Sequence, residues 1–106
     1  MIITTEIQRK DGTSLIGDKL VKVEWLLREN ELTVNLKIYA NEQVFKEGFS
    51  PITNVIGFPL RMYILLTEDE IELIGEDAVE YFVSRELELL LGKGSIKLWQ
   101  KKRRNY

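Results

Sequence analysis

The sequence contains no cysteine and no histidine among its 106 residues. Without cysteine the chain has no disulfides, no thiolate metal sites and no thiol nucleophiles. Without histidine it lacks the commonest general base and metal ligand, so catalytic triads and zinc centres are excluded. No nucleotide-binding loop occurs either, because the Gly92-Lys93-Gly94 segment is too short to cradle a phosphate and follows a predicted helix. We therefore expect no catalytic residue, no metal site and no cofactor, and a protein that is not an enzyme.

Long apolar runs are also missing. The first ten residues, MIITTEIQRK, carry no basic leader followed by an apolar segment of about 7 to 15 residues. No segment approaches the roughly 20 apolar residues of a membrane-spanning helix. We therefore expect a soluble, cytoplasmic protein without a membrane partner, and the lack of cysteine suits a reducing compartment.

Acidic residues are absent from the end of the chain. Residues 93–106 hold six basic and no acidic residues, whereas residues 1–92 hold nine basic and seventeen acidic residues. The net charge of −2 therefore conceals a dipolar chain. From this contrast and the length we predict a single domain over residues 1–100, followed by a basic tail over residues 101–106.

The stretch from Leu20 to Ala40 predicts a long antiparallel β-hairpin, because apolar and polar residues alternate along both of its halves. A turn centred on Asn30 and Glu31 would place Glu24 opposite Lys37. A register shifted by two residues would instead oppose two lysines, and like charges directly opposite each other are unfavourable. We therefore expect the first register, with either a two-residue turn or a longer loop in the same register.

A shorter hairpin is expected before the long one. Residues 2–16 contain β-favouring residues on both sides of an Asp-Gly pair at positions 11–12, which is a strong turn signal. After the long hairpin, the pattern weakens over residues 41–59. We interpret that segment as a long, partly ordered connection with short strands near residues 44–45 and 54–56.

Strand character returns at residues 60–66, where Leu60, Met62, Ile64 and Leu66 share one side. The proline before this segment cannot donate to a strand ladder, so it suits a first position or an edge strand. Thr67 and Glu70 then form a capping box, which predicts a short helix. A strand over residues 71–74 is the competing interpretation.

The strongest helix signal covers residues 76–91 and ends before Gly92. Its apolar stripe comprises Val79, Phe82, Val83, Leu87, Leu90 and Leu91. A last short strand is expected within residues 95–100. Together these elements predict an α+β fold, with an antiparallel sheet of about five or six strands built on two successive hairpins and one amphipathic C-terminal helix packed on one face.

Candidate contact residues come from two places. On the sheet face opposite the helix we expect a second, smaller apolar surface formed by Leu26, Tyr39, Tyr63 and Leu65. Phe49 and Phe58 of the connection are further candidates for this surface, and lids over the core are the alternative interpretation of both. The tail supplies Trp99, Lys101, Lys102, Arg103 and Arg104.

These features favour a non-enzymatic assembly or protein-interaction subunit that self-associates or docks on a larger complex, such as a small structural or accessory protein of a virion or mobile element. The alternative is a nucleic-acid-associated accessory factor that uses residues 101–106 to neutralise phosphates. A third hypothesis is a carboxylate-based enzyme or small-ligand binder. Nine of the residues from Glu68 to Glu88 are acidic, but their spacing matches no calcium loop and suits a solvated helix start.

Overall fold

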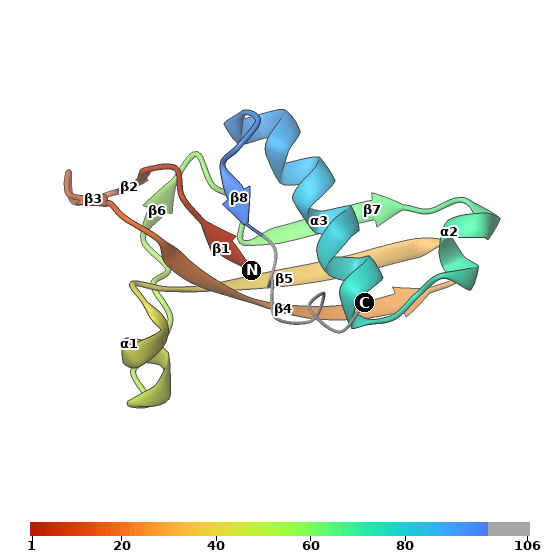
Figure 1. Cartoon of the computed structure of the whole chain (residues 1–106), viewed down its shortest axis with the longest axis horizontal. Helices are drawn as coiled ribbons and strands as arrows, with labels where there is room; N and C mark the ends of the chain where they lie inside the picture. Colours follow the sequence, from red (N-terminus) through yellow and green to blue (C-terminus); the bar gives the residue numbers. More distant parts are fainter. Residues whose placement is uncertain (98–106) are drawn as a thin grey trace.

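The computed structural model describes residues 1–97 of the chain (Figure 1). Its elements in chain order are β1 (Ile2–Ile3), β2 (Ile7–Arg9), β3 (Ser14–Leu15), β4 (Lys19–Arg28), β5 (Glu31–Tyr39), α1 (Glu42–Lys46), β6 (Val55–Ile56), β7 (Arg61–Leu65), α2 (Glu68–Glu72), α3 (Glu76–Leu91) and β8 (Ile96–Lys97).

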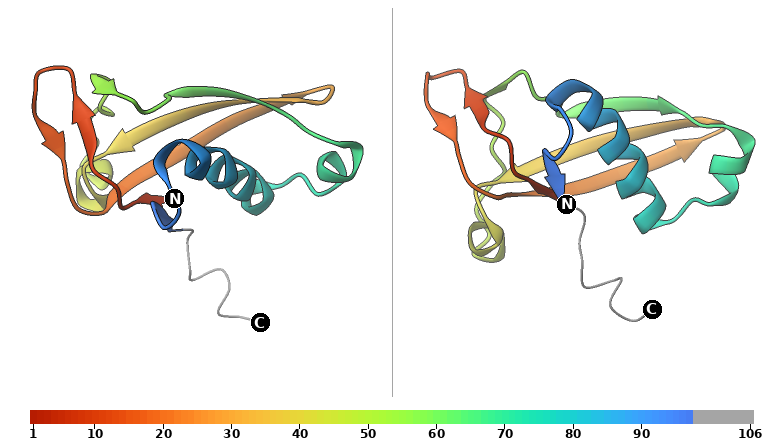
Figure 2. Two further views of the ribbon diagram at one scale, coloured as in Figure 1. Left: turned by 90° about the horizontal axis from the view of Figure 1, so that it is seen from above. Right: turned by 45° about the horizontal axis from the view of Figure 1, so that its top comes forward.

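The strands form two antiparallel sheets, and α3 crosses one face of the larger one (Figures 1 and 2). The five-stranded main sheet has the order β7-β5-β4-β1-β8, and the three-stranded sheet has the order β3-β2-β6. This architecture confirms the predicted α+β fold. Both hairpins are present, although the shorter one, β2–β3, belongs to the smaller sheet and β1 pairs instead with β4 and β8.

The main core lies between the sheet and α3. The helix has the predicted bounds and contributes the buried residues Val79, Phe82, Val83 and Leu87. Leu90 does not belong to this core, because it is 65% exposed near the end of the helix, which runs past the sheet in Figure 1. From the strands, alternate residues such as Val34 and Ile38 are fully buried in the same hydrophobic core.

The register of the long hairpin differs from the one that we expected. Arg28 pairs with Glu31, so the turn consists of two residues, and Lys22 stands opposite Lys37. The pairing is therefore shifted by two residues toward the arrangement that charge repulsion disfavours. The turn also requires a positive φ of 58° at Glu29, a conformation that is uncommon for residues other than glycine.

Two local contacts relieve the repulsion between the opposed lysines. Lys37 Nζ lies 2.8 Å from Glu24 Oε2, which belongs to the neighbouring row of the ladder. Lys22 Nζ lies 4.6 Å from the centre of the Phe45 ring and makes a cation–π contact. The predicted attraction between Glu24 and Lys37 is therefore present, but it is diagonal across the two strands rather than directly opposite.

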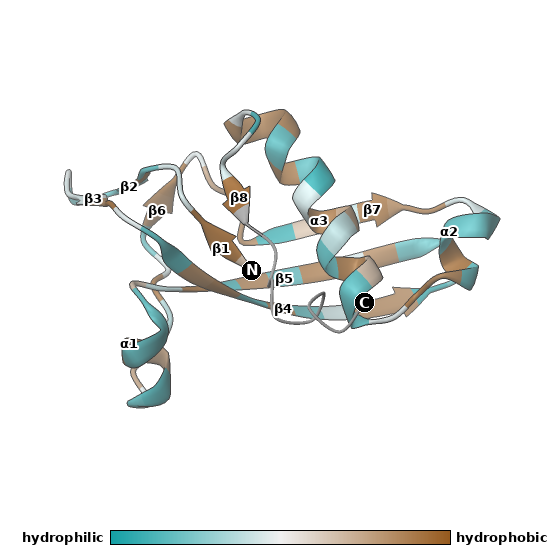
Figure 3. Cartoon of the chain, in the orientation of Figure 1, coloured by the Kyte–Doolittle hydropathy of each residue, from teal (hydrophilic) through white to brown (hydrophobic). Residues whose placement is uncertain are grey.

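Phe45 belongs to a short helix, where we expected a strand near residues 44–45. The helix α1 begins after Asn41, whose side-chain Oδ1 accepts a hydrogen bond from the backbone N–H of Val44 at 2.9 Å. This N-cap satisfies a backbone donor that a strand would have paired with a neighbouring strand. Figure 3 shows α1 as largely hydrophilic, in contrast to the hydrophobic β1. The strand expected within residues 54–56 is present as β6.

The C-terminal half follows the prediction more closely. β7 lies at the edge of the main sheet, and the capping box of Thr67 and Glu70 starts the helix α2, so the competing strand interpretation is wrong. Arg85 Nη1 of α3 donates to Glu70 Oε2 at 2.9 Å and connects the two helices. Gly75 is the N-cap of α3.

No helix within the described residues is long and apolar enough to cross a membrane.

Candidate interaction surface

The two faces of the main sheet differ in what covers them. Along β4, Val21, Val23 and Trp25 point toward α3 or its margin, whereas the alternate residues Lys22 and Glu24 are exposed on the other side. The left view of Figure 2 shows α3 on one side of the long strands. We call the opposite side the outer face, and α1 covers only one end of it.

Three rows of cross-strand neighbours make up the open part of the outer face. From the α1 end toward the hairpin turn they are Glu24–Asn35–Arg61, Leu26–Thr33–Tyr63 and Arg28–Glu31–Leu65, each taken from β4, β5 and β7. Leu26 is 58% exposed, Tyr63 is 61% exposed and Leu65 is 71% exposed. We call these three residues and Thr33 the outer patch. The fold therefore brings together three contact residues predicted from distant parts of the chain.

Charged and polar side chains surround the outer patch. Arg61 Nε donates to Asn35 Oδ1 at 3.0 Å, and the Glu24–Lys37 ion pair lies beside them. The hydrogen bond that Lys37 donates to Glu24 and the negative charge of Glu24 raise the pKa of Lys37, so this side chain remains an ammonium group at neutral pH. An apolar centre with a polar rim is the usual organisation of a protein–protein interface.

Tyr39 lies on the outer face but does not belong to the exposed surface that we expected it to join. It is only 7% exposed, because α1 folds back over this end and the Phe45 ring packs edge-on against it at a centroid distance of 5.0 Å. Phe58 is also 7% exposed and lies in the main hydrophobic core, which agrees with the alternative interpretation as a lid. Phe49 is 61% exposed, just after α1.

The remaining predicted contacts lie outside the described residues. They are Trp99, Lys101, Lys102, Arg103 and Arg104, which follow β8. The outer patch therefore rests on residues of β4, β5 and β7 alone. Thr33, Asn35 and Arg61 were not among the predicted contacts, because their polar side chains give no signal until the pairing of the three strands is known.

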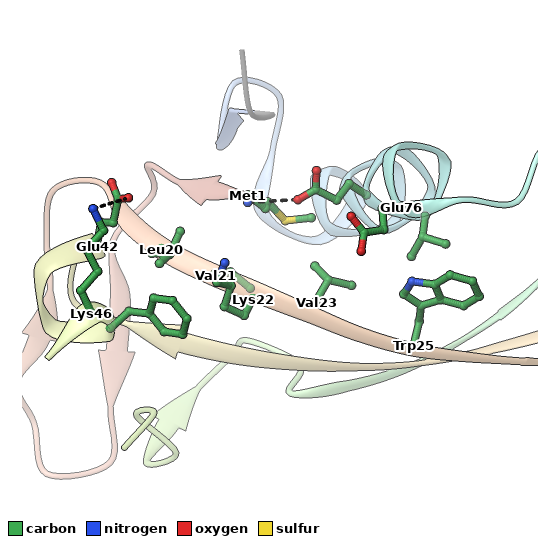
Figure 4. A pocket seen from close by; sticks show the side chains of 12 residues that line it. Met1, Leu20, Val21, Lys22, Val23, Trp25, Glu42, Lys46 and Glu76 are labelled. Carbon is green, nitrogen blue, oxygen red and sulfur yellow. Dashed lines mark hydrogen bonds and ion pairs between the residues drawn. The ribbon is translucent and has the colours of Figure 1, made fainter. Parts of the chain in front are cut away.

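A groove of about 420 Å³ opens beside β4, between α1 and the start of α3. Figure 4 shows Trp25 and Glu76 toward one end and the Glu42–Lys46 pair toward the other. Between them the amino group of Met1 lies 3.1 Å from Glu80 Oε1. The described lining contains carboxylates and ammonium groups but no hydroxyl or thiol. No sequence pattern indicates this groove, since its walls come from four separate segments of the chain.

Lys19 and Glu70, which lie outside the outer patch, also have shifted pKa values. Lys19 is fully buried, its Nζ donates to the Gly17 carbonyl, and burial lowers its pKa although Asp18 and Glu6 oppose this effect. The pKa of Glu70 is lowered first by the backbone N–H of Thr67 and then by Arg85.

No group of three or more aspartate and glutamate residues within residues 1–97 is arranged to hold a metal ion. The described residues define a two-sheet α+β protein in which one face of the main sheet is covered by a helix and the other carries an exposed apolar patch. Comparisons with models of protein families, with curated proteins and with solved structures found no match.

Proposed function

We propose that the protein is a non-enzymatic interaction subunit. Through the outer patch it binds either further copies of itself or the proteins of a larger assembly. The observation that supports this function is the exposure of Leu26, Tyr63 and Leu65 side by side on one sheet face. Apolar side chains that gather on one exposed surface mark interaction sites far more often than scattered ones do. We place the protein in the cytoplasm, because a chain without cysteine suits a reducing compartment.

The composition of the outer patch is that of an interface with weak affinity. Covering the exposed parts of one leucine or tyrosine side chain contributes about 1 to 2 kcal/mol. Tyrosine is also enriched among the residues that dominate binding energies. Because association costs several kcal/mol of translational and rotational freedom, three such residues support a reversible contact rather than a permanent one.

Site-specific photo-cross-linking tests this function. The benzophenone amino acid p-benzoylphenylalanine is introduced in place of Tyr63 in the full chain. The matched control carries it in place of Tyr81, which is 55% exposed on α3 and away from the patch. Each chain is irradiated alone and in an extract of the cells that produce the protein, and the cross-linked peptides are identified by mass spectrometry.

We expect position 63 to form a protein cross-link to a defined peptide, and position 81 to form none. The Leu26→Asp substitution should abolish the cross-link at position 63, because it places a charge in the same row of the patch. Two results would contradict the proposed function. One is no cross-link at position 63, either in the chain alone or in the extract. The other is equal cross-linking at positions 63 and 81.

A further inference from the structure

We propose that the partner of the outer patch is a second copy of this chain, packed sheet against sheet about a two-fold axis along the Leu26–Thr33–Tyr63 row. This inference rests on the proposed function and specifies its partner. The axis lies in the plane of the interface and at right angles to the strands. Leu26, Thr33 and Tyr63 then each meet the same residue of the second copy.

The position of the axis follows from a property of two-fold interfaces, in which every residue on the axis faces its own copy. A row on the axis must therefore be free of charge, since identical charges would oppose each other. The row on one side contains Glu24 and Arg61, and the row on the other contains Arg28 and Glu31. Of the three open rows of the outer face, only Leu26–Thr33–Tyr63 meets this requirement.

The same axis brings opposite charges together on β4, while Asn35 faces Glu31 and Arg61 faces Leu65 of the second copy. A half-turn about it reverses the order of the rows and keeps each strand above its own copy. Glu24 therefore faces Arg28 of the second copy, and Arg28 faces Glu24 of that copy. These are two equivalent contacts between opposite charges. One row further out, Lys22 and Lys37 face the region of the hairpin turn, where Glu29 lies.

An axis parallel to the strands is much less favourable. If it ran along β5, Lys37 would face Lys37 of the second copy, and Glu31 would face Glu31. Both pairs would repel at the centre of the interface. The charge pattern of the outer face therefore favours one two-fold arrangement over the other.

The length of the outer face also suits this arrangement. The helix α1 covers the end near Tyr39, and its Phe45 reaches as far as Lys22. The hairpin turn of the second copy would extend to the same row, so α1 marks the end of the contact surface. Three strands about 4.8 Å apart, with a rise of about 3.4 Å per residue, give roughly 400 Å² of sheet per copy over this length. That is below the standard of about 800 Å² per partner, so we expect a weak, reversible dimer that forms as the protein concentration rises.

Charge reversal tests the geometry directly. In a dimer of R28E chains, both contacts between position 24 and position 28 join two acidic side chains. In a dimer of E24R chains, both contacts join two basic side chains. In a mixed dimer of one R28E chain and one E24R chain, both contacts join opposite charges. The double variant E24R/R28E also restores both contacts within its own homodimer. Neither position is buried, and circular dichroism establishes that each variant is folded.

The measurement is sedimentation velocity of the full chain over a concentration series at low and high salt. We expect a concentration-dependent dimer for the unmodified chain and at least a tenfold weaker dimer for R28E or E24R alone. Association should return in their equimolar mixture and in the double variant. The control E72R reverses an exposed charge on α2, away from the outer face, and should leave the dimer unchanged.

Two results would overturn the inference in different ways. A chain that remains monomeric at every concentration excludes the second copy as partner. If position 63 still cross-links to a different protein, the proposed function stands without self-association. A dimer that R28E and E24R leave intact, or that both weaken without recovery on mixing, excludes this two-fold arrangement.

Discussion

Lys22 and Lys37 stand directly opposite each other in the central hairpin, yet each side chain has a different partner. Lys37 forms an ion pair with Glu24 at 2.8 Å, and Lys22 lies 4.6 Å from the centre of the Phe45 ring. The second partner comes from α1, which does not belong to the hairpin. The tertiary contact of α1 therefore helps the sheet to adopt a register that the two strands alone disfavour.

Phe45→Ala should destabilise the fold, because it removes both the cation–π contact with Lys22 and the aromatic packing against Tyr39. We expect the free energy of unfolding to fall by about 1 to 3 kcal/mol, measured by urea denaturation. The matched control is Phe49→Ala, since Phe49 is 61% exposed and should change stability by no more than about 0.5 kcal/mol. Equal effects of the two substitutions would contradict a structural role for α1.

Thr67→Ala should lower the free energy of unfolding by about 1 kcal/mol. The Thr67 hydroxyl accepts a hydrogen bond from the backbone N–H of Glu70, and its loss leaves a helix donor without this partner. Thermal denaturation followed by circular dichroism measures the effect. Thr53→Ala is the control, because Thr53 is exposed outside any helix or strand. An unchanged melting temperature for Thr67→Ala would show that the cap does not contribute.

Stability should decrease in acid through Glu70, whose pKa is lowered by the Thr67 backbone N–H and by Arg85. A carboxylate with a lowered pKa in the folded state stabilises the fold above its unfolded-state pKa. That stability is lost as the pH falls through the folded-state pKa. Glu70→Gln should therefore lower the melting temperature at neutral pH and have progressively less effect below about pH 4.5. A difference that is independent of pH would contradict this account.

Lys19→Met should change stability in the opposite direction to Glu70→Gln at neutral pH. Burial lowers the pKa of Lys19, so between the folded-state and unfolded-state values the unfolded chain binds more protons. Stability of the unmodified chain therefore rises with pH through that range. We expect Lys19→Met to be more stable at neutral pH, with an advantage that narrows as the pH approaches about 10.5, the ordinary lysine pKa.

The urea midpoint of both chains, measured from pH 7 to pH 10.5, provides the comparison for Lys19. Lys10→Met is the control, since Lys10 is exposed, in contrast to the fully buried Lys19. If the urea midpoint of Lys19→Met exceeds that of the unmodified chain by the same amount across this range, the charge of Lys19 does not destabilise the folded chain.

Much of the fold was predictable because its signals are local. The alternation along residues 20–40 depends only on the two-residue period of a strand, and the capping box of Thr67 and Glu70 lies within four consecutive residues. The bounds of α3 were predictable for the same reason, from the apolar stripe and the glycine that follows it. The exposure of Leu26, Tyr63 and Leu65 also follows from strand periodicity, once a helix covers the other face.

The sequence by itself determined which segments become strands and helices and which of their faces are apolar, since these depend on neighbouring residues. Only the tertiary structure decided the hairpin register, the burial of Tyr39 and the groove beside β4, because each depends on segments that are distant along the chain. The Leu26–Thr33–Tyr63 row likewise exists only after three strands pair. Its central position between two charged rows is therefore a property of the folded sheet and not of any one segment.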